Sequence, residues 1–182
     1  MANSDIYKKI SSELKYNGLI MDVYVDKIEF PNGEEHYREI IKKRSASAVL
    51  PIGDNGDIIL VRQYRHPIGK MSLEIPAGLS EPNENPIETA KRELEEEIGF
   101  LPKKIDFICK THGSIGFSDE SIHIYIAKDL QKTKQNFDYG EVIHIEIYSL
   151  SECLNMIYLG KITDSKTIIA ILHYNNILRK EL

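Results

Sequence analysis

The sequence predicts an α/β (α+β) fold in which mixed β-sheets are sandwiched between helices, with an antiparallel β-sheet element at the N-terminus. Three observations support this prediction. Apolar and polar residues alternate along several short segments bounded by turn residues, as they do in half-buried strands. Residues 85–99 carry the start and stop signals of a helix, and two amphipathic segments close the chain as further helices.

The first segments of the chain predict strands. Residues 1–15 are a polar lead-in, for which we expect a short helix or a disordered segment. The turn Pro31-Asn32-Gly33 then separates two alternating segments, which predicts an antiparallel hairpin. The strands expected in this half of the chain lie at residues 18–30, 36–42, 45–51 and 58–64.

The second half of the chain predicts three more strands and two helices. The strands are expected at residues 105–110, 121–127 and 142–148. In the last of them Ile143, Ile145 and Ile147 are expected to face inward. The closing helices are expected from their caps, which are Ser149 with Glu152 for a helix ending near Gly160, and Thr163 or Asp164 for the final one.

Length, charge and cysteine content limit the function classes. The 182 residues suffice for one well-buried domain at residues 44–182, with a small N-terminal element at residues 1–43. The net charge of -5 argues against nucleic acid as a partner, because a phosphate backbone requires a basic surface. Two cysteines without CxxC spacing indicate a reducing compartment. Since no apolar signal region or membrane-spanning segment is apparent, we expect a soluble cytoplasmic protein without a membrane partner.

The central helix is unusually acidic. Asn85 is its expected N-cap, with Pro86 at the first helical position, Glu88 in a capping-box relation and Gly99 as the C-terminal stop. The apolar residues share one stripe, and an adjacent arc of roughly 100° carries three carboxylates. The stripe consists of Ile87, Ala90, Leu94 and Ile98, and the acidic arc of Glu93, Glu96 and Glu97.

This acidic arc predicts a cation site. Like charges three and four residues apart repel by about 0.2–0.5 kcal/mol per pair on an exposed helix, so a bound cation would relieve them. Oxygen ligands suit Mg2+ or Mn2+ better than zinc. The alternative is a solvated surface, in which Lys91 pairs with Glu95 and Arg92 with Glu96.

The spacing around the helix strengthens the metal-site reading. The constrained positions run through 23 residues as Gly78, Glu84, Arg92-Glu93-Leu94, Glu96-Glu97 and Gly99-Phe100. This pattern resembles the signature of the Nudix hydrolases. The resemblance implies a loop-helix-loop that binds divalent metal and cleaves nucleoside diphosphates linked to another moiety.

Further segments resemble the ADP-ribose pyrophosphatase branch of that family. They are residues 18–45, 60–65, 72–78 and 116–127, so that the resemblance covers most of the chain. The branch usually has a proline immediately before the loop glycine, where this chain has Ile115. Another nucleoside diphosphate sugar is therefore an alternative to ADP-ribose.

The resemblance implies roles for the acidic residues and their neighbours. The carbonyl of Ala77 with Glu93 and Glu97 would hold Mg2+, for which Mn2+ is a possible substitute, and Glu96 would share a further ion. Arg92 would orient these carboxylates, and Glu84 would support the loop. We thus expect Glu96, Glu97 and Arg92 to be catalytic.

The general base is expected outside the helix. In the resembled branch a later loop supplies the carboxylate that activates water, and Glu141 is the best-placed match. Asp138 and Glu120 are its competitors.

The remaining expected roles concern substrate and assembly. Arg62 and Arg65 would meet phosphate oxygens, Glu74 would lie at the pocket wall, and Glu120 would also contact substrate. The branch implies a homodimer in which the hairpin at residues 18–42 contributes to the partner's nucleotide pocket. An aromatic among Tyr24, Phe30 and Tyr37 would stack on the base.

Taken together, the residues and the resemblance predict a metal-dependent pyrophosphohydrolase. It would cleave ADP-ribose, or a related nucleoside diphosphate sugar, to AMP (or another nucleoside monophosphate) and ribose 5-phosphate (or another sugar phosphate). One alternative is a nucleoside triphosphate or dinucleoside polyphosphate pyrophosphatase. A second is a non-catalytic ADP-ribose-binding sensor.

Overall fold

The computed structural model describes residues 6–135 and 142–180. The chain divides into two compact units. One comprises Met1–Ser45 and His112–Ser121, and the other comprises Ala46–Thr111 and Ile122–Leu182. Asp138 and Glu141, two candidates for the general base, lie outside the described residues.

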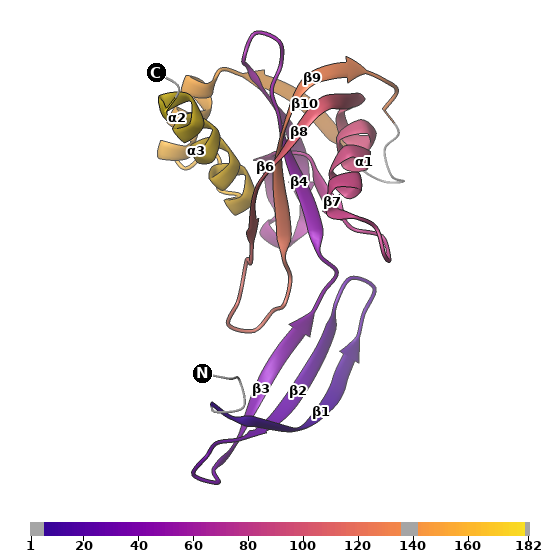
Figure 1. Ribbon diagram of the computed structural model, residues 1–182, viewed down its shortest axis with the longest axis vertical. Coiled ribbons are helices and arrows are strands. Elements are labelled where there is room, and N and C mark those ends of the chain that lie inside the picture. Colours follow the sequence, from indigo (N-terminus) through magenta and orange to yellow (C-terminus); the bar gives the residue numbers. More distant parts are fainter. Residues whose placement is uncertain (1–5, 136–141, 181–182) are drawn as a thin grey trace. The chain divides into compact units, whose positions relative to one another are not determined.

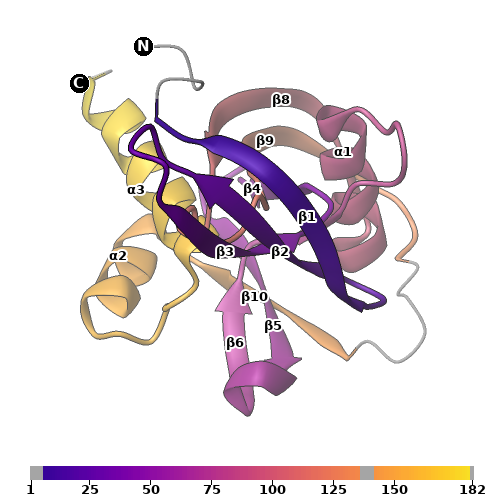
Figure 2. The same cartoon turned by 90° about the horizontal axis from the view of Figure 1, so that it is seen from below.

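The N-terminal unit is built on a three-stranded antiparallel sheet in the order β1-β2-β3 (Figures 1 and 2). Its strands are β1 (Lys8–Asn17), β2 (Asp22–Glu29) and β3 (Glu35–Lys42). The predicted hairpin is confirmed as β2 and β3. The helical or disordered state expected for residues 1–15 is wrong from Lys8 onward, because β1 pairs with β2 along its length although every one of its side chains is exposed.

The second part of the N-terminal unit is the segment at residues 112–121, which attaches to β3. The backbone N–H of Ile41 donates to the carbonyl of Phe117 at 2.7 Å, and the N–H of Asp119 donates to the carbonyl of Ile41 at 3.2 Å. Lys42 Nζ lies 2.7 Å from the carboxylate of Asp119. This segment thus continues the hydrogen bonding of β3, although about seventy residues of chain separate the two.

The larger unit contains two sheets, one mixed and one antiparallel. One sheet has the order β7-β4-β9-β8, with β4 and β9 parallel, and the other has the order β10-β5-β6. The strands are β4 (Ala46–Pro51), β5 (Ile58–Arg65), β6 (Lys70–Glu74), β7 (Ala77–Leu79), β8 (Phe100–Thr111), β9 (Ile122–Lys132) and β10 (Ile143–Tyr148). A short 3-10 turn, His66–Ile68, joins β5 to β6.

Helices cover this unit on two sides. In Figure 1, α1 (Pro86–Ile98) lies on one side of the strands, and α2 (Leu150–Tyr158) and α3 (Ser165–Lys180) lie on the other. The apolar stripe of α1, including Leu94, packs against Val49 and Tyr125 of the strands. On the opposite side Ile171 of α3 packs into the core with Leu50. The predicted arrangement of mixed sheets between helices is confirmed.

One strand is less buried than its pattern predicts. Ile143 is buried, but Ile145 and Ile147 are 39% and 61% exposed, so the inward orientation expected for these two is wrong. β10 is an edge strand, and its neighbour β5 carries the buried Ile59 and Val61 opposite these residues. The core layer therefore reaches β5 and the start of β10 but does not cover the rest of β10.

The two closing helices begin as their sequences predict. Ser149 and Glu152 form a reciprocal capping box at α2, and Asp164 accepts a bond from the N–H of Thr167 at the start of α3. Cys109 and Cys153 are both free thiols. Among the described helices, none combines the length and apolar character that a membrane crossing needs.

Candidate active site

Helix α1 is fixed at both ends by local interactions. The side chain of Asn85 accepts a bond from the N–H of Ile87 at 3.2 Å, and Gly99 closes the helix at φ 72°, where a side chain would be strained. The hydroxyl of Ser47 on β4 donates to the carbonyl of Pro86 at 2.7 Å. Glu88 pairs with Lys91 at 2.9 Å. The start of the acidic helix is thus attached to a buried strand.

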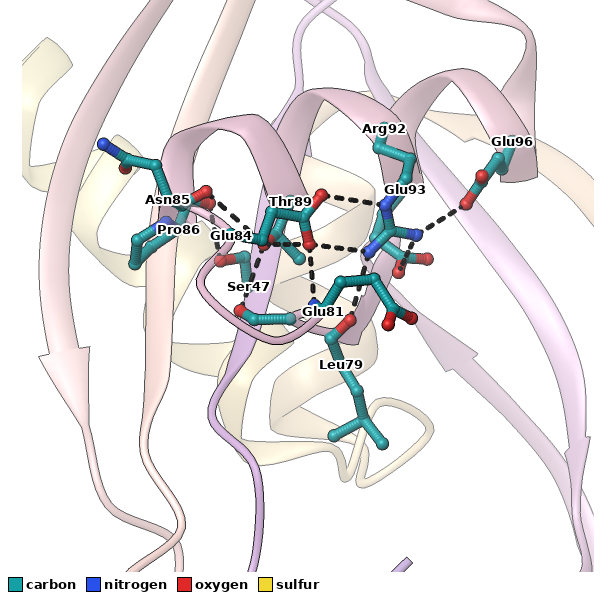
Figure 3. A network of polar contacts seen from close by, with 11 residues as sticks. Ser47, Leu79, Glu81, Glu84, Asn85, Pro86, Thr89, Arg92, Glu93 and Glu96 are labelled. Atoms are coloured by element: carbon teal, nitrogen blue, oxygen red, sulfur yellow. Dashed lines mark hydrogen bonds and ion pairs between the residues drawn. The ribbon is translucent and has the colours of Figure 1, made fainter.

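Arg92 is the centre of the polar network shown in Figure 3. Its Nε and Nη2 donate to the two oxygens of Glu84 at 3.0 and 3.1 Å, and Nη2 also donates to the carbonyl of Leu79 at 3.1 Å. Its Nη1 donates to Glu93 at 2.7 Å and to Glu96 at 2.8 Å. These bonds, first those to Glu84, raise the pKa of Arg92 well above its ordinary value. One guanidinium therefore orients three carboxylates and the preceding loop.

Glu84 joins the loop to the helix. Besides Arg92, it accepts a bond from the hydroxyl of Thr89 at 2.8 Å and one from the N–H of Glu81 at 2.9 Å. The bonds from Arg92, helped by those from Glu81 and Thr89, outweigh partial burial and lower the pKa of Glu84 to about 2. Sequence reasoning did not single out Thr89, whose hydroxyl is buried. Its position four residues before Glu93, on the acidic side of α1, is the signal that could have found it.

Glu93 lies directly against the backbone of β7. A Cβ placed on Gly78 would come within 2.0 Å of the Oε1 atom of Glu93, so the close approach requires glycine at this position. Glu97, one helical turn further on, is only 5% exposed. The carboxylate of Glu93 thus lies beside Gly78, and that of Glu97 is buried on the same helix.

These residues fit a divalent cation. Three carboxylates on the loop and helix, those of Glu84, Glu93 and Glu96, face the single guanidinium of Arg92, and oxygen donors of this kind suit a hard ion. Within the described residues, no three acidic, histidine or cysteine side chains are already gathered as a metal cluster. The network instead holds Glu93 and Glu96 on either side of one nitrogen of Arg92.

The two arginines of β5 point to different partners. Arg65 forms a two-bond pair with Glu74 at 2.9 and 2.8 Å, whereas Arg62 pairs with Glu146 on β10, with one bond of 2.9 Å. Residues three apart on a strand lie on opposite faces, so the structure does not bring Arg62 and Arg65 together. The bonds to Glu74 are the main reason that the pKa of Arg65 is raised, and the charge of Glu97 contributes. Arg65 is therefore the arginine on the side of the acidic helix.

Glu74 is a buried anion with two cationic partners. Its exposed fraction is 3%, and besides Arg65 it accepts a bond of 2.5 Å from Lys166 on α3. Burial acts to raise the pKa of Glu74, but the bonds from Arg65 and the charge of Lys166 lower it to about 2. Sequence reasoning missed Lys166, although a lysine in the first turn of a helix is unfavourable beside the helix dipole and indicates a specific partner.

Glu120 lies in the N-terminal unit, where it pairs with Lys43 of the segment that follows β3. The expected aromatic residues also belong to this unit. Phe30 packs edge-on against His36 with ring centroids 5.1 Å apart, and Tyr37 is 65% exposed. Ile115, which stands where the branch usually has a proline, is exposed in its loop. Of these residues, Tyr37 and Ile115 have side chains open to solvent.

Comparison with known proteins decides the family. The NUDIX domain family matches residues 42–168 of the chain, which include the whole acidic helix and its loop. The chain belongs to the Nudix family. The family and the fold class expected from the sequence are both confirmed.

Curated relatives of this Nudix chain align over nearly its full length. It is 39% identical over 166 residues to the ADP-ribose pyrophosphatase of Bacillus subtilis (strain 168), with 90% of each chain covered. It is 41% identical over 167 residues to the methanol dehydrogenase activator of Bacillus methanolicus, again with 90% of each covered. The ADP-ribose pyrophosphatase of Mycobacterium tuberculosis (strain ATCC 25618 / H37Rv) is 33% identical over 175 residues, which cover 94% of this chain and 84% of that protein.

A solved structure shows the same Nudix fold. The crystal structure of an ADP compounds hydrolase superposes with a TM-score of 0.88 and covers 97% of this chain and 96% of that one. The two sequences are 23% identical. The likeness therefore extends over both units and concerns the fold.

Proposed function

We propose that this Nudix hydrolase cleaves the diphosphate of ADP-ribose or a related nucleoside diphosphate sugar. ADP-ribose would give AMP and ribose 5-phosphate. The placement of Glu93 against Gly78, with Glu96 and Glu97 on the same helix, is the observation on which the proposal depends. It is supported by two relatives named ADP-ribose pyrophosphatase that are 39% and 33% identical to the chain.

We assign the metal site to α1 and the strand beside it. The carbonyl of Ala77 with Glu93, Glu96 and Glu97 would hold Mg2+, for which Mn2+ would substitute. A divalent ion held here supplies positive charge to the diphosphate and lowers the pKa of a water. Arg92 keeps Glu93 and Glu96 oriented through its Nη1 atom, and Glu84 anchors Arg92 from the loop side.

The other steps use residues beyond α1. Glu141 would accept the proton of the attacking water, Arg65 would contact a phosphate oxygen, and Glu74 would hold Arg65 in place. Water attacks one phosphorus in line, and the other phosphate leaves with its sugar. Arg62 lies on the opposite face of β5, paired with Glu146, so we assign the diphosphate contact to Arg65 alone.

The N-terminal element is the proposed dimerisation surface. Residues 1–43 would pair two copies of the chain in the cytoplasm, and Glu120 would contact substrate from its loop. The support is that the three-stranded sheet and its first turn expose large apolar side chains. These are Ile10, Leu14, Tyr16 and Tyr37 on the strands and Leu19 and Ile20 in the turn between β1 and β2. Sedimentation equilibrium of the full chain tests this assignment, since a monomer at micromolar concentration would contradict it.

A substrate panel tests the function. With Mg2+ present, ADP-ribose, ADP-glucose and GDP-mannose are compared with nucleoside triphosphates and diadenosine polyphosphates, and products are separated by ion-exchange chromatography. Turnover of the nucleoside diphosphate sugars alone supports the proposal. Turnover of the triphosphates alone supports a nucleoside triphosphate pyrophosphatase instead. Binding of ADP-ribose without cleavage would indicate a sensor.

The proposed general base is tested by one substitution. Glu141→Gln is expected to lower kcat at least about 100-fold, the lower end for loss of a general base. Glu120→Gln is measured in parallel, because Glu120 is the rival candidate among the described residues and is paired with Lys43. A near-normal rate for Glu141→Gln would transfer the role to Glu120 or Asp138.

A further inference from the structure

The segment that carries Ala77 and Gly78 crosses between two sheets. β6 ends at Glu74 in the three-stranded sheet, and β7 begins at Ala77 in the four-stranded sheet. Ile75 and Pro76 lie between the strands and belong to neither. A crossing without ladder bonds needs other partners for its backbone, because a buried N–H left unpaired is costly.

Helix α3 supplies the partner for this crossing. The N–H of Ile75 donates to the hydroxyl oxygen of Thr167 at 2.9 Å, and both residues are buried. The hydroxyl of Thr167 in turn donates to the carboxylate of Asp164 at 2.5 Å, which fixes the direction in which its lone pairs point. Pro76 has no N–H to satisfy, and its carbonyl accepts a bond from Val49 at 2.9 Å. The N–H of Ile75 and the carbonyl of Pro76 therefore each have one defined partner.

Lys166 reinforces the same junction through a side chain. Its Nζ lies 2.5 Å from Glu74 and 3.0 Å from Asp164, so it connects the last residue of β6 to the cap of α3. The first turn of α3 thus holds the crossing at two adjacent residues, one through the backbone and one through a carboxylate. Ala77 follows Ile75 by two residues, and Gly78 is packed against Glu93.

We propose that Thr167 is a positioning residue for the metal site, which it controls by fixing the backbone of Ile75 and hence the carbonyl of Ala77. This inference rests on the proposed site at Ala77, Glu93 and Glu97. The side-chain hydrogen bonds of Thr167 go to Ile75 and Asp164 and not to the acidic helix, all of which the structure describes. Its effect is transmitted through the two-residue crossing that leads into β7.

The test measures metal binding without substrate. Thr167→Val keeps the shape of the side chain and removes the acceptor for Ile75. We expect it to weaken the binding of Mn2+, measured by electron paramagnetic resonance of the free ion, by about 10-fold or more, as is typical for loss of a partner that orients a ligand. kcat is expected to fall in parallel, with KM at saturating Mn2+ nearly unchanged. The hydrogen exchange of the Ile75 amide should accelerate.

Two variants separate positioning from general loss of stability. Thr167→Ser keeps the hydroxyl and is expected to restore Mn2+ affinity and the protection of Ile75. Ile171→Val removes one buried methylene from the same helix and should lower Tm without changing Mn2+ affinity. If Thr167→Val does not fold, Thr167→Ala tests the same bond with a smaller side chain.

The outcomes distinguish this inference from the proposed function. Parental Mn2+ affinity in folded Thr167→Val or Thr167→Ala overturns the positioning role. So does an equal loss of affinity in Ile171→Val. If the parent binds Mn2+ but cleaves no nucleoside diphosphate sugar, the proposed substrate is wrong, and the positioning role is still read from the Mn2+ measurement. A parent that binds no Mn2+ contradicts the metal site and with it this inference.

Discussion

Arg92 and Glu84 form a two-bond ion pair that joins helix α1 to the loop that precedes it, with distances of 3.0 and 3.1 Å. The same guanidinium reaches the carbonyl of Leu79, so both ends of the loop are held by one side chain. Because Nη1 of Arg92 also binds Glu93 and Glu96, the conformation of the loop and the orientation of the carboxylates depend on each other.

Replacement of Arg92 by lysine tests this dependence. Arg92→Lys keeps the charge but cannot make five bonds with a planar fork, so we expect kcat to fall about 10–100-fold, as for loss of residues that orient metal ligands. Lys91→Arg, at the adjacent position on the solvent side, is the matched control and should behave as the parent. Steady-state kinetics at saturating Mg2+ give the comparison. An Arg92→Lys enzyme of parental kcat would show that charge alone suffices.

Gly78→Ala should separate activity from stability. The added Cβ would meet the end of a flexible side chain, Glu93, so the carboxylate is displaced while the strand is kept. We expect Mn2+ affinity and kcat to fall at least about 10-fold, with a change in stability near the 0.5 kcal/mol typical of neutral surface positions. Gly113→Ala, where a Cβ meets nothing within 4 Å, is the control. Isothermal titration with Mn2+ and urea unfolding measure the two effects, and full Mn2+ affinity in Gly78→Ala would exclude Glu93 as a ligand held by this contact.

Glu97→Gln tests the charge of the acidic helix. The amide has the shape of the carboxylate but binds a divalent ion poorly, so most turnover should be lost while the circular dichroism spectrum stays that of the parent. Glu95→Gln, on the same helix but outside the acidic arc, is expected to retain parental activity. Removal of metal with EDTA should abolish turnover in the parent, and added Mg2+ should restore it. Equal activity of the two glutamine variants would refute the metal assignment.

The lowered pKa of Glu74 predicts that the folded protein loses stability in acid. This pKa is 4.5 ordinarily and about 2 in the folded chain, so the unfolded state takes up a proton first as the pH falls. The contribution of Glu74 to the free energy of unfolding amounts to roughly 3 kcal/mol. It is fully present above about pH 4.5 and is lost as the pH falls from about 4.5 to 2. Urea unfolding at pH 7 and pH 3 should show a smaller difference for Glu74→Gln than for the parent. Glu88→Gln, which removes an exposed carboxylate, should leave the difference unchanged.

Local signals made much of the fold predictable. Asn85 and Gly99 mark the ends of α1, and the capping box at Ser149 marks the start of α2, because each contact lies within a few residues along the chain. β1 could not be recognised in the same way. Its side chains are all exposed, and the apolar alternation of Ile10, Leu14 and Tyr16 is interrupted by Ser12. The strand is stabilised by pairing with β2 rather than by burial of one face.

The contacts of the candidate site likewise separate into those between residues close in sequence and those between distant residues. The acidic arc and its link to Arg92 follow from helical spacing, which places residues three and four apart together. Two contacts join residues that are 92 apart in sequence, Lys166 with Glu74 and Thr167 with Ile75. No local sequence pattern predicts such contacts. The separation of Arg62 from Arg65, by contrast, was available from the two-residue period of a strand.

The N-terminal unit is formed by two separate stretches of chain, which are joined by hydrogen bonds between Ile41 and the backbone of Phe117 and Asp119. A truncation after residue 45 would therefore not release an independent module cleanly. It would leave the segment at residues 112–121 with unpaired backbone groups and with Asp119 deprived of Lys42. Any experiment that exchanges this unit between Nudix proteins must move both stretches together, and a graft of the N-terminal residues alone is expected to lower the solubility of the recipient.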